Sequence, residues 1–377
     1  MAGIYIHVPF CKTRCSYCDF YSTTESKLSQ RFIETLCQEL ILRKDELKGE
    51  AIKTIYFGGG TPSQLAYNEL KCVFDTLKNN YEISSVSEVT LEGNPDDLSI
   101  EYLRDLKKLP FNRLSIGIQT FQPSMLNKLN RRHTSEQAKE AVIHAQACGF
   151  DNISIDLMYG LPGELMNNWI DDINEAIKLD IQHISAYHLI YENGTPIFKK
   201  LQEGIIQEVD EDFSLQSFTN LIHSLTDKGF IHYEISNFAK SGKFAEHNTS
   251  YWTGEKYLGF GPSAHSYNGI NRSYNASSLH KYLEDIESGN HIQEVEILNI
   301  TDKYNDFIIT SLRTMWGIPL EELKKSFGDT YYDYAQKMAK KHLNVGNLIL
   351  KDNRLKLTQK GIFISDGIMS DLLYVEA

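Results

Sequence analysis

The sequence lacks several features that would place the protein in a specialised class. It has no run of eighteen apolar residues, which argues against a transmembrane helix. Its amino terminus has neither a basic region nor a cleavable apolar stretch, so we expect no export signal and a cytoplasmic location. Positive charge is in deficit: the net charge of −12 argues against a nucleic-acid partner, because phosphate backbones attract basic proteins.

Cysteine is scarce as well, with six among 377 residues. This number argues against the disulfide framework that small secreted domains use. Cys37, Cys72 and Cys148 stand far apart within helical patterns, and we expect them to be ordinary thiols. The composition, 41% hydrophobic and 23% charged, is that of a globular protein, and the length predicts about two or three domains.

The other three cysteines, Cys11, Cys15 and Cys18, are close together and directly follow a short apolar strand. Pro9 ends that strand, so the cysteines are expected on a loop. Iron–sulfur clusters are held by cysteine thiolates, usually four, so three would leave one iron without a protein ligand. An open position on a metal is where chemistry or a non-protein ligand goes. Zinc and reactive thiols are the alternatives, although the second cysteine pair typical of zinc sites is missing downstream.

Strand and helix patterns alternate from residue 1 to about residue 230. The predicted strands are Ile4–Val8, Thr54–Phe57, Glu88–Glu92, Arg113–Gln119, Asn152–Met158 and His183–Leu189. The predicted helices are Leu28–Lys48, Ser63–Asn79, Ile100–Lys108, Ser135–Cys148 and Asn167–Lys178. Six βα units predict a parallel sheet with right-handed crossovers. The fold class is therefore α/β, with a partial or complete (β/α) barrel as the expected closure and a doubly wound sheet as the alternative.

Apolar and polar residues alternate within these strands; Ile153 and Ile155, for example, face away from Asp156. A parallel strand covered on both faces is apolar almost throughout, so we expect the polar face to line a cavity. Glu92, Gln119 and Asp156 are the polar residues nearest the carboxyl ends of their strands. Barrels and open α/β sheets place their active sites at that end, where the cysteine loop also lies.

A glycine segment, Gly58-Gly59-Gly60-Thr61-Pro62, follows the second strand. Successive glycines let the backbone approach a ligand closely and expose its N–H groups. The alternative is a tight turn into a helix, with Thr61 as the N-cap and Pro62 in the first turn. The segment lacks the lysine of a phosphate loop and the spacing of a dinucleotide fingerprint.

The Cys-x3-Cys-x2-Cys spacing is similar to that of the radical S-adenosylmethionine (SAM) superfamily. That resemblance implies a 4Fe–4S cluster whose unique iron is chelated by the amino and carboxylate groups of SAM. Further motifs resemble the oxygen-independent coproporphyrinogen oxidase group over nearly the whole chain: Tyr5–Cys11, Gly58–Pro62, Leu91–Pro95, Gly117–Phe121, Asp156–Gly163 and Tyr257–Ser266. The resemblance implies SAM contacts at Tyr5, Tyr17, Gly59, Gly60, Thr61, Glu92, Gln119, Arg131 and Asp156. From the residues alone, Arg131 and Arg132 are typical of a solvated basic turn.

Two departures distinguish this chain from the oxidase itself. The oxidase has a further cysteine two positions beyond the third, where this chain has Phe20. The segment His247-Asn248-Thr249-Ser250-Tyr251-Trp252 resembles the His-Asn-x-x-Tyr-Trp signature of the heme-chaperone branch, the HemW type. Both departures favour a heme chaperone over the decarboxylating enzyme.

The chemistry of that segment suits heme. Imidazole is a common axial ligand of heme iron, and Tyr251 and Trp252 offer flat faces to a porphyrin. The alternative is a surface loop whose aromatic side chains pack onto the barrel. Twelve histidines leave other ligand candidates, including His7, His188 and His265.

We expect three regions: a radical SAM barrel core at 1–235 with the cluster loop, a heme-motif and glycine-rich connecting segment at 236–280, and a helical domain at 281–377. The polar stretch Asn268–Ser278 is predicted to be a loop. In the last region, helices are predicted at Ser278–Glu287, Asp302–Thr314, Leu320–Ser326, Tyr331–Lys341 and Ile362–Leu373, with a hairpin formed by Leu348–Asp352 and Leu355–Leu357. This resembles a winged-helix unit, which we interpret as a lid or packing module.

The leading hypothesis is a heme chaperone that binds heme and passes it to a haemoprotein, for instance one of the membrane-bound respiratory chain, with peripheral membrane contact. The alternative is a radical SAM enzyme that decarboxylates porphyrinogen propionates. There, a 5′-deoxyadenosyl radical from SAM would abstract hydrogen from the propionate. A third hypothesis is a radical SAM enzyme acting on an unrelated substrate, with His247 structural.

Overall fold

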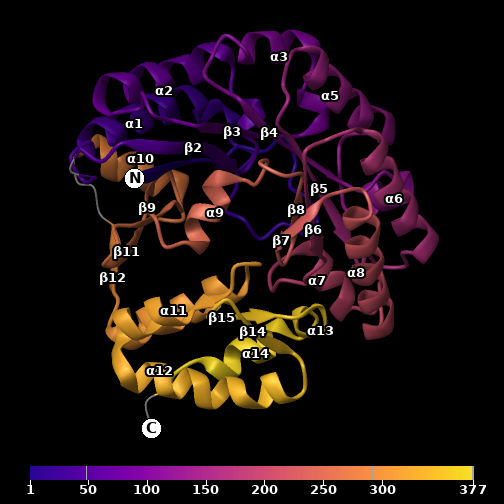
Figure 1. Ribbon diagram of the computed structural model, residues 1–377. Helices are drawn as coiled ribbons and strands as arrows, with labels where there is room; N and C mark the ends of the chain where they lie inside the picture. The colour runs from indigo at the N-terminus through magenta and orange to yellow at the C-terminus, as the bar shows by residue number, and fades with distance from the viewer. Residues whose placement is uncertain (48, 290–292, 376–377) are drawn as a thin grey trace.

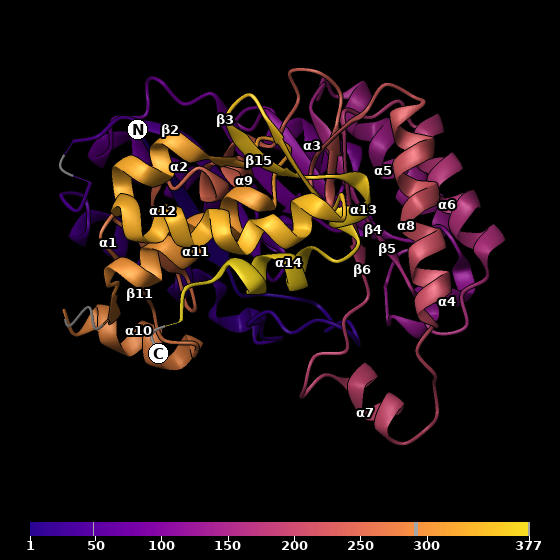
Figure 2. The same ribbon diagram turned by 60° about the horizontal axis from the view of Figure 1, so that its bottom comes forward.

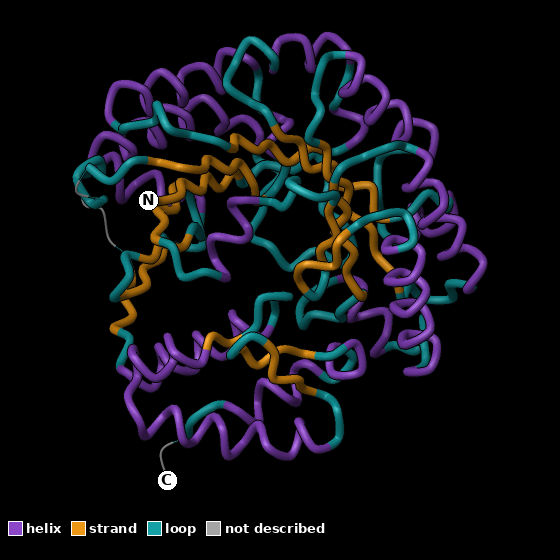
Figure 3. Tube along the Cα trace, viewed as in Figure 1, coloured by secondary structure: helices purple, strands orange, loops and turns teal. Residues whose placement is uncertain are grey.

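One curved sheet of twelve strands dominates the computed structural model, which describes residues 1–47, 49–289 and 293–375 (Figures 1 and 3). Its central strands are parallel and follow the order of the chain: β1 (Ala2–Val8), β2 (Ile52–Gly59), β3 (Glu88–Gly93), β4 (Arg113–Gln119), β5 (Ile153–Tyr159) and β6 (His183–His188). A doubly wound sheet reverses its strand order at one point. Since this order has no reversal, the crossover helices all fall on one face, and the sheet curves into a partial barrel.

The helices of these units cover the convex outer face of the sheet (Figure 1). They are α1 (Ser29–Leu42), α2 (Tyr67–Asn80), α3 (Ile100–Leu106), α5 (Ser135–Ala147), α6 (Met166–Lys178) and α8 (Glu211–Thr226), while the short helix α4 (Pro123–Lys128) follows β4. Helix α1 ends at Leu42, earlier than predicted, and the predicted end at Lys48 lies outside the described residues. Helix α4 was not predicted; Pro123 starts it, since proline tolerates a first helical position. The short helix α7 (Pro196–Gln202) extends away from the body of the molecule (Figure 2).

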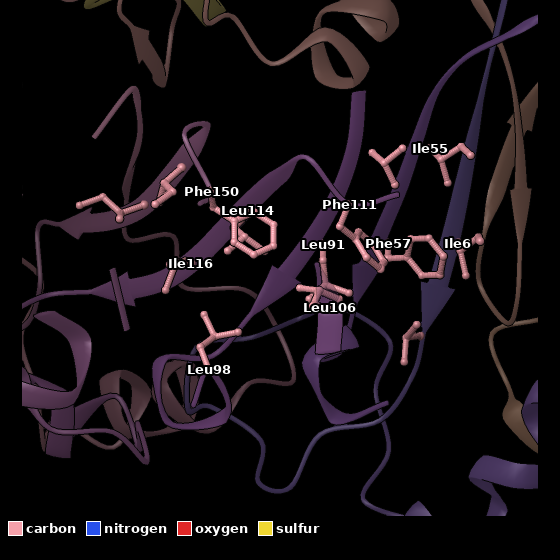
Figure 4. Packing of buried hydrophobic residues seen from close by; sticks show 14 of the residues in the cluster. Ile6, Ile55, Phe57, Leu91, Leu98, Leu106, Phe111, Leu114, Ile116 and Phe150 are labelled. Carbon is pink, nitrogen blue, oxygen red and sulfur yellow. The ribbon is translucent and has the colours of Figure 1, made fainter. Parts of the chain in front are cut away.

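The predicted alternation within the strands is confirmed. Apolar side chains such as Ile6, Phe57 and Leu114 are buried between the sheet and the outer helices (Figure 4). Phe57 and Phe111 meet edge to face, with ring centroids 5.2 Å apart. Burying apolar surface at roughly 25 cal/mol per Å² is the main stabilising term in such a core. Burial of the apolar side chains against the helices therefore fixes the register of the strands, and the alternating polar side chains lie on the concave side of the sheet.

Both edges of the sheet are extended by later parts of the chain. β8 (Asn237–Ala239) and β7 (Ile231–Glu234) follow β6. β9 (Lys256–Phe260) pairs with β1 in parallel and leads to the antiparallel strands β10 (His265–Tyr267), β11 (Asn271–Tyr274) and β12 (Glu294–Ile297). The predicted loop Asn268–Ser278 is therefore wrong, because β11 lies inside it. Residues 268–271 form the hairpin turn between β10 and β11, with Gly269 at φ +88° as its first central residue.

Helix α9 (Glu246–Trp252) lies on the concave side of the sheet, inside the arch (Figure 1). The carboxylate of Glu88, at the start of β3, accepts hydrogen bonds from the backbone N–H groups of Glu246 and His247, at 2.8 and 3.0 Å. These contacts satisfy two amides at the start of the helix and hold it against the amino-terminal ends of the strands. The alternative interpretation of this segment as a surface loop is therefore wrong.

The last part of the chain forms a second core below the open side of the arch (Figure 1). Its elements are α11 (Ile300–Leu312), β13 (Ile318–Pro319), α12 (Leu320–Asn344), β14 (Leu348–Lys351), β15 (Arg354–Leu357), α13 (Gln359–Ile362) and α14 (Ser365–Leu372), while α10 (Leu279–Glu287) packs on α1. The predicted helices Leu320–Ser326 and Tyr331–Lys341 are confirmed as the two helical parts of α12, which meet at the non-helical Gly328, while the predicted helix Ile362–Leu373 divides into α13 and α14. Arg313 links the two cores through an ion pair with Glu234 at 2.9 Å. The division of the chain at residues 235 and 280 stays a prediction.

None of the described helices combines the length and the apolar character needed to cross a membrane.

Candidate functional site

The cysteine loop lies at the carboxyl end of β1 and is fixed by backbone hydrogen bonds. Cys11 N–H donates to the Thr23 carbonyl at 2.9 Å, and Ser16 N–H donates to the Leu129 carbonyl at 3.0 Å. The thiols of Cys11, Cys15 and Cys18 are all partly exposed. Among the described residues, no three His, Cys, Asp or Glu side chains converge on a single metal ion. In an iron–sulfur cluster each thiolate would bind a different iron, an arrangement that three cysteines spread along a loop can provide.

Two polar side chains donate hydrogen bonds to these thiols. The Thr61 hydroxyl donates to Cys11 Sγ at 3.3 Å, and Arg131 Nη1 donates to Cys15 Sγ at 3.2 Å. The interpretation of Arg131 as part of a solvated turn is wrong, because its guanidinium also donates to Asn94 Oδ1 at 2.8 Å. Arg132 instead pairs with acidic side chains next to the loop. Arg131 therefore brings a positive charge to the cysteines, as an anionic cluster or a carboxylate requires.

The glycine segment brings the end of β2 against the cysteine loop. Gly59 has φ +103°, and a Cβ atom there would lie 2.6 Å from the His7 ring. A Cβ atom at Gly60 would lie 2.8 Å from the Phe10 carbonyl oxygen. Thr61 occupies the predicted N-cap position of a short 3-10 helix that starts at Pro62, but its hydroxyl bonds to Cys11 and does not cap the helix. The glycines are thus required for the close approach of two strand ends at the site.

Two carboxyl groups face the concave side of the sheet. The Tyr56 hydroxyl donates to Glu92 Oε1 at 2.6 Å. Burial, with Asp156 nearby, raises the pKa of Glu92 to about 7, although the Tyr56 hydrogen bond acts against this. Burial likewise raises the pKa of Asp156 to about 6. Such a pair favours a ligand that brings positive charge or hydroxyl groups to it.

The other residues predicted to contact SAM are distributed along the same edge. The Gln119 side chain, at the left-handed end of β4 with φ 71°, lies beside Gly117 and Arg131. Burial raises the pKa of the Tyr17 phenol, which lies near Arg131 and Cys15. Tyr5 lies deeper in the arch and stacks on Tyr56, with ring centroids 6.2 Å apart. The role of these residues in binding SAM stays a prediction.

The predicted heme motif lies on α9, and its histidine is fully buried. His247 Nδ1 is 2.8 Å from the Thr54 hydroxyl, and Nε2 is 2.8 Å from the Tyr251 hydroxyl. The ring stacks on Tyr56 at 5.1 Å, and burial, assisted by Arg113, lowers the His247 pKa to about 3. Both nitrogens are occupied by hydroxyl groups, so iron ligation by His247 would require one of them to leave. This role stays a prediction, as does that of Asn248, which is partly buried.

A pocket of about 1170 Å³ lies between the concave side of the sheet and the second core. Its volume exceeds that of most small-ligand sites and is ample for a large flat ligand. Its wall contains side chains from β1, the cysteine loop, α9, the β9–β11 strands and α11. The aromatic residues in this wall are Tyr5, Phe20, Tyr21, Tyr251, Trp252, Tyr257, Tyr267, Phe307, Trp316 and Phe327.

The sequence analysis singled out Tyr5, His7, Tyr251, Trp252 and His265 of this wall and missed most of the remaining residues. Tyr257, Tyr267 and Arg272 all point to the same side of the β9–β11 strands, as register and alternation require. The sequence signal for these strands was the alternation of side chains at every second position on either side of the Asn268-Gly269 sequence, which is typical of a β-hairpin. Phe307 and Trp316 come from the second core, and their spacing alone gave no indication that they face the barrel.

Comparisons with known proteins agree with this arrangement. Residues 5–176 match the radical SAM superfamily, and residues 298–364 match the HemN C-terminal domain. The chain is 32% identical to the heme chaperone HemW of Bacillus subtilis over 99% of both chains. It is 29% identical to the mitochondrial radical S-adenosyl methionine domain-containing protein 1 of Danio rerio, over 99% of this chain and 87% of that one. The solved structure of coproporphyrinogen III oxidase (HemN) from Escherichia coli superimposes with a TM-score of 0.86 at 22% identity, over 99% of this chain and 90% of that one, which shows a shared fold.

Proposed function

Because this chain belongs to the HemW family of the radical SAM superfamily, we propose that it is a heme chaperone, which binds heme and transfers it to a haemoprotein. The observation that carries this proposal is the aromatic pocket beside the cysteine loop. Its wall offers many flat apolar faces, with polar and charged groups at intervals, which suits a porphyrin with its propionates. Phe20, where the oxidase has a further cysteine, argues against the decarboxylating alternative.

Membership of the radical SAM superfamily implies a 4Fe–4S cluster and SAM. We assign the cluster to Cys11, Cys15 and Cys18, and SAM to the edge formed by the glycine segment, Glu92, Gln119, Arg131 and Asp156. The cluster, when bound, supplies one-electron chemistry to SAM. The chain itself contributes a fixed loop, a guanidinium at Cys15 and a buried carboxyl pair that positions the cationic ligand.

Heme would dock in the pocket against Tyr251 and Trp252 of α9. Trp252 is held in place by Arg313, whose guanidinium carbon lies 4.8 Å from the indole ring centre. Lys303 also reaches the wall of the pocket, and we find no ion pair for it with any described residue. It is therefore available to a heme propionate. The recipient would be a haemoprotein, and we propose one of the respiratory chain, approached from the membrane surface.

Heme titration of the purified full-length protein, followed by visible absorbance, tests the proposal. We expect a saturable Soret change at one heme per chain, and transfer of that heme to an added apo-haemoprotein. A protein that binds no heme would overturn the proposal. Anaerobic conversion of coproporphyrinogen to protoporphyrinogen would instead establish the decarboxylating alternative.

A further inference from the structure

An axial ligand must present a free nitrogen to the iron, and few histidines around the pocket do so. Both nitrogens of His247 are bonded to hydroxyl groups. His7 is buried, with Nε2 2.9 Å from the Tyr21 carbonyl and Nδ1 3.1 Å from the Tyr5 hydroxyl. His188 is 2.9 Å from the Ser214 hydroxyl through Nε2 and does not line the pocket. None of these three is ready to bind a metal without rearrangement.

His265 differs from all three. It is exposed, it lines the pocket, and within the described residues neither ring nitrogen has a hydrogen-bond partner. Burial on one side, together with the positive charge of Arg272, lowers the pKa of His265 from its ordinary value. The lowered pKa favours the neutral ring, which has a lone pair available to iron.

The backbone under His265 is rigidly held. His265 pairs with Tyr274 across β10 and β11, and the two rings stack with centroids 5.2 Å apart. On the opposite side, a Cβ atom at Gly259 would lie 2.1 Å from the His265 carbonyl oxygen, so β9 and β10 are in close contact. The next residue, Ser266, is buried and accepts hydrogen bonds from Gly259 N–H at 2.9 Å and from Arg43 at 3.1 Å. A ligand on such a support is already positioned before heme arrives.

Phe20 and His265 both line the pocket, and Phe20 is 65% exposed although it is a large apolar side chain. Its exposed ring therefore adds an apolar face to the aromatic wall of the pocket, on which a flat ligand can pack. We propose that His265 is the axial ligand that captures heme iron in the pocket, and that the macrocycle covers Phe20. This inference rests on the proposed function, since it names the ligand of the same heme.

The experiment compares the ferric heme complexes of full-length wild type, His265→Gly, His247→Ala and His280→Ala by visible and electron paramagnetic resonance spectroscopy. His280 is an exposed histidine on α10, away from the pocket, and serves as the control. We expect His265→Gly to lose the histidine-ligand signature and to bind heme at least about tenfold more weakly than wild type. Added imidazole should restore the signature, which separates loss of a ligand from misfolding.

A wild-type spectrum in His265→Gly would overturn the inference, and so would a failure of imidazole to restore the signature. If His247→Ala alone loses the signature, then His247 is the ligand and His265 is not. Wild-type protein that binds no heme would refute the proposed function itself, a result distinct from the other outcomes. Methionine at position 265 gives a second check, because His265→Met should change the ligand signature without removing a ligand.

Discussion

The imidazole Nε2 of His247 lies 2.8 Å from the hydroxyl of Tyr251, one helical turn further along α9. Since Thr54 occupies the other nitrogen, the histidine connects the floor of the barrel to a tyrosine that lines the pocket. The motif therefore works as a unit in this conformation: its histidine positions its aromatic faces. Because His247 makes both hydrogen bonds without heme, a substitution of His247 can change the stability of the fold independently of any bond to iron.

Acid should destabilise the protein through His247. Its folded pKa is about 3, against an ordinary value of 6.5, so below pH 6.5 the unfolded chain binds the proton more readily than the folded one. Stability is therefore lost as pH falls from 6.5, by up to about 1.4 kcal/mol per pH unit for such a group. Urea unfolding between about pH 4 and 7 should show a shallower pH dependence for His247→Asn than for wild type. Equal slopes would contradict a neutral buried imidazole; His280→Asn, at an exposed site, serves as the control.

The three loop cysteines should each be needed for iron. Single alanine substitutions at Cys11, Cys15 or Cys18 remove one of three protein ligands, so we expect loss of most iron and sulfide after anaerobic reconstitution. Wild type should retain about four iron atoms per chain, as a 4Fe–4S cluster requires. Cys148→Ala is the matched control, because Cys148 lies on the outer face near the Ile100 carbonyl. Full iron in a loop variant would rule out that cysteine as a ligand.

Gly59→Ala should lower the thermal stability of the protein and its affinity for SAM more than Gly149→Ala does. Both glycines have positive φ, so both substitutions introduce backbone strain, but only the Cβ at Gly59 would contact another group, the His7 ring. Overpacking of this kind typically costs about 1–3 kcal/mol beyond the strain. Thermal unfolding and SAM binding by calorimetry measure the two effects. Similar destabilisation in the two variants would show that the approach of Gly59 to His7 is not tight.

SAM affinity should rise with pH through Glu92. The pKa of this carboxyl is about 7 in the free protein, and cationic SAM favours its ionised form, so binding strengthens as pH rises through 7. In Glu92→Gln, we expect weaker binding and a flatter profile by calorimetry. Glu164→Gln is a useful control, because that buried carboxyl also has a pKa of about 7 and bonds instead to the Gly160 backbone. An unchanged profile in Glu92→Gln would remove Glu92 from the SAM site.

Trp252→Ala should weaken heme binding, since the indole forms part of the pocket wall and is fixed by Arg313. Loss of one aromatic contact is typically worth about 0.5–1.5 kcal/mol beyond buried area, so we expect a roughly three- to tenfold change in affinity. Trp252→Phe retains a flat ring and should retain most of the affinity. If both variants titrate with heme as wild type does, the porphyrin does not contact α9.

Secondary structure was predicted best for the strands in which apolar residues alternate regularly with polar ones over five or more positions. The six central strands were predicted to within a few residues, because their apolar residues repeat every second position and face the helices. Strands β10 and β11 were missed because they are short and rich in serine, tyrosine and histidine. The Asn268-Gly269 sequence between them was a signal that the polar composition obscured.

The site was predictable only in part, for a different reason. The order of the motifs placed the cysteines, the glycine segment and the acidic residues on one edge, since all follow parallel strands. The burial of His247 could not be read from its motif, because Thr54 and Glu88 come from distant strands. Likewise, half of the pocket wall belongs to the second core, whose placement depends on long-range packing such as the Glu234–Arg313 pair.

Tyr5 has a position that couples the two proposed ligands. Its side chain lines the pocket, while its ring stacks on Tyr56, whose hydroxyl holds Glu92. A ligand that moves Glu92 therefore changes the surface offered to heme. Thermodynamic reciprocity then requires that SAM alter heme affinity by the same factor by which heme alters SAM affinity. A carrier built in this way would hold its cargo with one affinity when SAM is bound and with another when SAM has left, so the binding equilibrium of SAM would set when heme is released.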